Sequence, residues 1–95
     1  MRPVIFEPRV RAEATAAGLA CGYAADVIDG VLATIAHEIG RTFDDLLLRQ
    51  PDYPERRGYM AIGEGVGLVE AICEDQNDKV VVIQLHITAF NPATK

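Results

Sequence analysis

The sequence has few basic residues, and this shortage narrows the class of protein. Nine lysines and arginines stand against 14 aspartates and glutamates, which gives a net charge of −5. Proteins that bind nucleic acid usually have a basic balance, because neutralising phosphates supplies much of their affinity. The acidic balance therefore argues against a nucleic-acid partner.

Long apolar runs and paired cysteines are also missing. No stretch approaches the roughly 18 apolar residues of a membrane span, so we expect no membrane association. Residues 1–7 contain Pro3 and charges instead of an apolar run, so no signal peptide is expected. Cys21 and Cys73 form no C-x-x-C unit and have small or apolar neighbours, which favours buried free thiols and leaves a disulfide open. The default expectation is a cytoplasmic protein.

The composition fits one globular domain that spans residues 1–95. The chain is 49% hydrophobic and 24% charged, and it shows no repeats or low-complexity segments. A chain of this length buries roughly 60–70% of its unfolded surface. That is enough for one core but not for an enclosed cofactor cavity as well, so we expect no cofactor.

The first half of the chain predicts a short strand followed by helices. Residues 4–6 form a β-prone run between two prolines, which favours a sheet edge because proline cannot donate to a ladder. Residues 10–21 are rich in alanine and favour a helix. A second helix is indicated by apolar residues with a 3.6-residue period: Val27, Ile28, Val31, Leu32, Ile35 and Ile39.

The ends of this second helix have several candidate signals. Asp26 is the expected N-cap, and Gly40 is a natural terminator. Thr42 and Asp45 resemble a capping box, after which the helical pattern continues to Gln50. The pattern is compatible with two helices that bend at Gly40 and with one long helix.

The second half of the chain predicts strands. After a polar loop at 52–58, the apolar period changes from about 3.6 residues to 2. A short strand is expected at 59–62, followed by a hairpin of strands at 68–74 and 80–90. The order strand, helices, three strands predicts an α+β fold, a two-layer sandwich with helices on one face of a mostly antiparallel sheet.

Side-chain alternation assigns two faces to the hairpin. One face is wholly apolar and is the predicted core side: Val81, Ile83, Leu85, Ile87 and Ala89. With a loop at 75–79, Glu70 falls opposite Gln84 on the other face, and His86 is their neighbour. The same second face carries further apolar residues: Leu68, Ile72, Val80, Val82 and Phe90.

This second face decides between the hypotheses for function. The helices are needed to cover the core side, so a second apolar face predicts burial against another copy of the chain. We therefore favour a small non-enzymatic interaction or regulatory module that forms a homodimer or higher oligomer, with a separate protein partner also open. In an alternative, Glu70 and His86 form the acid–base pair of a small enzyme. A third class is a small-ligand site in a cleft between the sheet and the helices.

Arginine and tyrosine gather just before the sheet. Arg56, Arg57 and Tyr59 could bind phosphate or stack on bases, and together with Gln84 they are candidate ligand-binding residues.

Two further motifs are favoured as structural. His37-Glu38 is followed by Arg41 where a zinc helix needs its second histidine, so no metal site is expected. The glycines between 63 and 67 lead into a strand and not a helix, which favours a turn or bulge that uses glycine at positive φ over a phosphate loop.

The stretch from Gly67 to Ile87 contains a Leu-Val-Glu-Ala-Ile run, an acidic turn and a Val-Val-Val-Ile run. Placed after a strand and helices, this order resembles the RelE/ParE type of bacterial toxin. Members that cut messenger RNA are generally basic and carry arginine, lysine, histidine or tyrosine in the late strands. This chain is acidic and has only His86 there. The resemblance therefore implies a degenerate toxin-type protein, which stands as an alternative.

Overall fold

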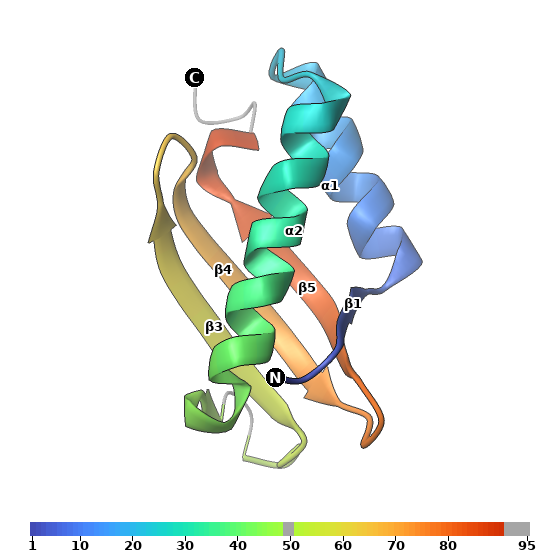
Figure 1. Cartoon of the computed structure of the whole chain (residues 1–95), viewed down its shortest axis with the longest axis vertical. Helices are drawn as coiled ribbons and strands as arrows, with labels where there is room; N and C mark the ends of the chain where they lie inside the picture. Colours follow the sequence, from blue (N-terminus) through green and yellow to red (C-terminus); the bar gives the residue numbers. More distant parts are fainter. Residues whose placement is uncertain (49–50, 91–95) are drawn as a thin grey trace.

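The computed structural model describes residues 1–48 and 51–90 (Figure 1). Within this part of the chain, two helices cover one face of a five-stranded mixed sheet, which confirms the predicted α+β fold. The elements in chain order are β1 (Val4–Phe6), α1 (Pro8–Ala20), α2 (Ala25–Thr42), β2 (Leu47–Leu48), β3 (Arg56–Gly63), β4 (Gly67–Asp75) and β5 (Val80–Ile87). Single 3₁₀ turns follow α2 at Phe43–Asp45 and β5 at Thr88–Phe90.

The sheet combines a local meander with one long-range pairing. Its strand order is β1-β5-β4-β3-β2, so β1 and β2 are the edge strands. β1 runs parallel to β5, and the other neighbours are antiparallel. The edge position predicted for residues 4–6 is therefore confirmed.

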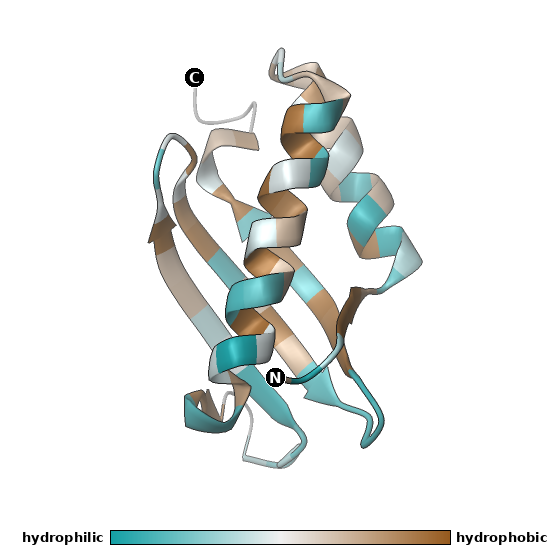
Figure 2. Cartoon of the chain, in the orientation of Figure 1, coloured by the Kyte–Doolittle hydropathy of each residue, from teal (hydrophilic) through white to brown (hydrophobic). Residues whose placement is uncertain are grey.

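The helices differ in how they contribute to the core. α2 buries an apolar stripe that appears as recurring brown bands in Figure 2, made of Ile28, Leu32, Ile35 and Ile39. Burying side chains of this kind contributes about 1.5–3 kcal/mol each. α1 buries only Val10 and Gly18, and a Cβ at Gly18 would lie 2.7 Å from Ile28 Cδ1. Glycine therefore lets the two helices approach closely at this point.

Gly40 lies inside α2 and does not end it. The helix runs as one piece to Thr42, and the chain's first residues cross it at Gly40, where Arg2 N–H donates to the Gly40 carbonyl at 3.2 Å. The capping box predicted at Thr42 is wrong, since the Thr42 hydroxyl donates backward to Glu38 O at 2.7 Å. Leu47–Leu48 is a strand, so the predicted helical continuation is also wrong, and its expected end at Gln50 lies outside the described residues.

The helix starts slightly earlier than predicted. Ala24 occupies the N-cap and Asp26 lies in the first turn, where its carboxylate accepts from Val27 N–H at 3.0 Å. An acidic residue in this turn is favourable because it lies near the positive end of the helix dipole.

The register of the β4–β5 hairpin differs from the predicted one. Asp75 pairs with Val80, which leaves a four-residue loop at 76–79. A β-bulge at Ile83 then inserts one extra residue into β5. As a result, Glu70 lies opposite His86 and not opposite Gln84 as predicted.

The bulge also moves side chains between the two faces of the sheet. Val80 and Val82 were predicted on the second face, but both are 0% exposed and belong to the core beside the helices. Phe90 lies beyond the end of β5, in the 3₁₀ turn, and is likewise buried in the core. The prediction of these three residues as interface residues is therefore wrong.

The remaining sequence predictions for this region fare better. Gly65 and Gly67 have φ values of 79° and 73° in the β3–β4 turn, which confirms their predicted role. Both cysteines are free thiols; Cys73 is buried in the core as predicted, and Cys21 is half-buried.

Candidate functional site

The face of the sheet that points away from the helices is the candidate functional site, and we call it the open face. Within residues 1–48 and 51–90, both helices lie on the opposite side of the sheet (Figure 1). Residues of the open face form rows across β3, β4 and β5. Following the strand register, the rows are Ile62–Leu68, Met60–Glu70–His86, Gly58–Ile72–Gln84 and Arg56–Glu74–Val81.

Large apolar side chains on this face are exposed. Met60 is 62% exposed and Ile62 is 85% exposed, although both belong to β3, which is not an edge strand of the sheet. At the β2 edge, Leu47 and Leu48 are exposed as well. An open hollow of about 740 Å³ extends from these leucines across Met60 and Ile72. Contiguous apolar surface of this kind marks interaction sites on soluble proteins.

Glu70 and His86 lie at the centre of the open face as a directly opposed cross-strand pair. Side chains in this relation have Cβ atoms about 4.5–5.5 Å apart, so the carboxyl group and the imidazole are neighbours on this face. The chain contains no serine, and the thiol of Cys73 is buried in the core. The pair therefore has neither of these nucleophiles beside it.

The arginines predicted to bind a ligand are separated by the sheet. Successive residues of a strand point to opposite faces, so Arg56 and Arg57 do not converge. Arg56 Nε donates to Glu74 at 3.2 Å, and its guanidinium lies 4.1 Å from the centre of the Tyr53 ring. On the open face, Arg56 is therefore held by an acidic and an aromatic neighbour.

Arg57 and Tyr59 belong to the helix-side face of β3. Arg57 donates to the Leu46 carbonyl at 2.6 Å and stacks on Phe43 with its guanidinium 5.6 Å from the ring centre. Tyr59 packs against the core, and burial raises the pKa of its hydroxyl. Since Gln84 lies on the open face, the predicted ligand-binding residues do not form one site.

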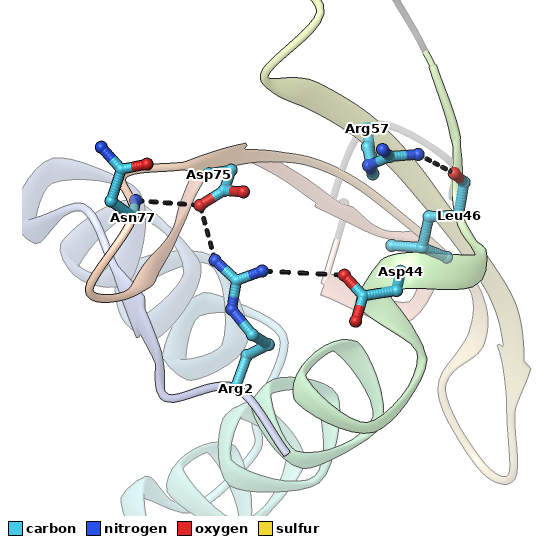
Figure 3. A network of polar contacts seen from close by, with 6 residues as sticks. All are labelled: Arg2, Asp44, Leu46, Arg57, Asp75 and Asn77. Atoms are coloured by element: carbon cyan, nitrogen blue, oxygen red, sulfur yellow. Dashed lines mark hydrogen bonds and ion pairs between the residues drawn. The ribbon is translucent and has the colours of Figure 1, made fainter.

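Sequence reasoning missed a polar network at the same end of the molecule as Arg57 and Leu46, drawn in Figure 3. Arg2 donates to Asp75 at 2.5 Å and lies 3.7 Å from Asp44, while the backbone N–H of Asn77 donates to Asp75 at 2.9 Å. The Arg2 hydrogen bond, and then that from Asn77, lower the pKa of Asp75. The network fastens the first residues to the β4–β5 loop. No sequence spacing could reveal it, because its partners lie 73 positions apart.

No known protein family, curated protein or solved structure matches this chain. The resemblance to RelE/ParE toxins therefore rests on the residue pattern from Gly67 to Ile87 and on the order of elements. Among the described residues, no helix is long and apolar enough to cross a membrane, and no three potential metal ligands gather.

Proposed function

We propose that the chain is a non-enzymatic interaction module that forms a homodimer through the open face of its sheet. The observation that carries this proposal is the exposure of Met60 and Ile62 on a sheet face that lacks a helical layer in the described part of the chain. Covering these side chains with a second copy would remove apolar surface from water, at about 25 cal/mol for each Å².

The second copy is the favoured occupant because of the charge distribution. Two copies each carry a net charge of −5, so they repel except where a surface has little net charge. On the open face, Arg56 and Glu74 compensate each other. A two-fold dimer also requires a surface that complements itself, and the open face offers exposed apolar side chains together with the oppositely charged Arg56 and Glu74.

The size of the face sets the expected strength. β3, β4 and β5 contain 8, 9 and 8 residues. Given the strand spacing and the rise per residue, these strands cover roughly 400 Å² before the relief of the side chains is counted. Stable interfaces usually bury about 800 Å² on each partner. We therefore expect a concentration-dependent dimer with a dissociation constant in the micromolar range or weaker.

The test is sedimentation velocity over a concentration series from low micromolar to near millimolar. Met60→Glu and Ile62→Glu each place a carboxylate on the open face and should weaken the dimer at least tenfold, which is about 1.4 kcal/mol. The matched control is Val27→Glu, which also replaces an exposed apolar side chain with a carboxylate. Val27 lies on α2, away from the open face, and is 48% exposed. A chain that stays monomeric throughout the series contradicts the proposal, as does a control variant that weakens the dimer as much as Met60→Glu.

A further inference from the structure

The outer edge of β5 is only partly paired. β1 pairs with Val80–Val82, after which Pro8 begins α1 and takes the chain away from the sheet. Proline suits the first helical turn because it has no N–H to leave unsatisfied. Across the described residues, no strand pairs with the outer side of β5 from Ile83 to Ile87.

Leu85 and Ile87 direct their backbone N–H and C=O groups outward from this edge of β5, as the β1–β5 pairing indicates. Val80 N–H donates to Pro3 O at 2.9 Å and Val82 O accepts from Glu7 N–H at 3.0 Å, so both residues use their backbone groups toward the outer side. Residues whose side chains share a face of a strand also direct their backbone groups to one side. Leu85 and Ile87 share the core side with Val80 and Val82, and their N–H and C=O groups therefore face outward.

Beside this edge lies a groove between β5 and α1, with a volume of about 540 Å³. Its wall on the α1 side is made of small apolar residues, Val10, Ala14 and Ala17. Arg9 and Glu13 of α1 also line the groove, and Gln84 and His86 line it from the open face of β5. The groove thus joins unpaired strand backbone to an apolar wall on one side and a polar border on the other.

We propose that this groove binds an extended peptide segment of a partner protein, which adds to β5 as a strand in line with β1. Strand addition to an exposed sheet edge gains affinity from main-chain hydrogen bonds and specificity from alternate side chains. The existing β1–β5 ladder is the same interaction within the chain: Val4 and Phe6 pack on the core, whereas Ile5 is exposed. The bound segment therefore alternates apolar residues toward α1 with polar residues toward solvent.

A lone segment suits the site better than a folded sheet edge. α1 borders the groove along its length, so a second copy that brought its own helical layer would have to place that layer against α1. The alanines of α1 leave space for the apolar side chains of a single strand. The free edge from Ile83 to Ile87 matches a segment of about five residues, since each strand residue advances about 3.3 Å.

The first test is amide hydrogen exchange by NMR with the capped peptide Lys-Val-Thr-Val-Thr-Val-Lys, whose lysines suit an acidic chain. The Leu85 amide should exchange at least tenfold more slowly when the peptide is added. The Gln84 and His86 amides point to β4 and should be protected with and without it, which provides an internal control. Unchanged exchange at Leu85 with millimolar peptide overturns the proposal. Protection that depends on protein concentration alone also overturns it, because the occupant is then a second copy.

The second test fills the groove. Ala14→Leu adds three carbons to the α1 wall, whereas Ala16→Leu makes the same change at an exposed position of the helix. Alanine and leucine are both strong helix formers, so α1 should persist in the two variants. Protection of the Gln84 amide reports that the sheet is intact. Fluorescence anisotropy of the labelled peptide should show at least tenfold weaker binding to Ala14→Leu and unchanged binding to Ala16→Leu. Equal affinities for the two variants contradict binding in this groove.

Discussion

Replacing Gly40 with alanine should destabilise the fold, although alanine is the better helix former. A Cβ at this position would lie 2.5 Å from the carbonyl oxygen of Arg2 and 3.2 Å from Val4 Cγ2. The oxygen belongs to backbone, so relief requires the segment before β1 to move. That movement would break the Arg2 N–H hydrogen bond to Gly40 O.

The magnitude follows from opposing terms. The change from glycine to alanine inside a helix gains about 1 kcal/mol, whereas overpacking a buried site costs about 1–3 kcal/mol and a lost hydrogen bond costs about 1 kcal/mol. We expect a net loss of about 1–3 kcal/mol in the free energy of unfolding. Gly30, in the same helix, has no atom within 4 Å of an added Cβ. Gly30→Ala should therefore stabilise the chain by about 0.5–1 kcal/mol.

Urea denaturation followed by circular dichroism measures both variants against the wild type. All three proteins must be compared at one concentration, because self-association would also change the apparent stability. In a domain of this size, each kcal/mol corresponds to a shift of about 4–8 °C in Tm, so thermal unfolding gives a second measurement. A Gly40→Ala protein as stable as Gly30→Ala would refute the close approach on which the reasoning depends.

Two further predictions concern titrating groups. Arg2, and then Asn77 N–H, hold the pKa of Asp75 below its usual range, so the ionised carboxylate stabilises the fold above the ordinary carboxyl pKa near 4. This stabilisation is lost as pH falls through the folded-state pKa; the stability gap between wild type and Asp75→Asn should thus shrink between neutral pH and about pH 3, and a constant gap in urea denaturation would contradict it. Burial raises the pKa of Cys73 to about 12. At about pH 8, iodoacetamide should therefore modify Cys21 first and Cys73 only in denaturant; mass spectrometry that finds equal rates in the folded chain would refute this order.

The fold class was predictable because its main signals are local. The apolar period from Val27 to Ile39 reflects one buried helix face, and the change to a period of two marks the sheet. The ends of α2 were less predictable, because glycine serves both to end helices and to admit another chain segment. At Gly40 the second role applies, and only the position of Arg2 in space reveals it.

The candidate site was predictable in part. Glu70, His86 and Ile72 were assigned to one face, and the strand register places them together there. The bulge at Ile83 was hidden, because the run from Val80 to Ile83 is apolar on both faces and gives no alternation that could mark a change of side. The sequence therefore could not separate core valines from those of a second face.

The pairing of β1 with β5 also has a consequence for how the chain folds. Val4 pairs with Val80, 76 positions later, whereas β3, β4 and β5 are joined by short hairpins. Contacts this distant in sequence raise the contact order and slow folding. During synthesis, α1 and α2 emerge well before β5. The apolar stripe of α2 therefore has no complete sheet to pack against until the final strand is available. The step that closes the sheet is therefore also the step that ends the exposure of this stripe, and conditions that delay it favour aggregation over folding.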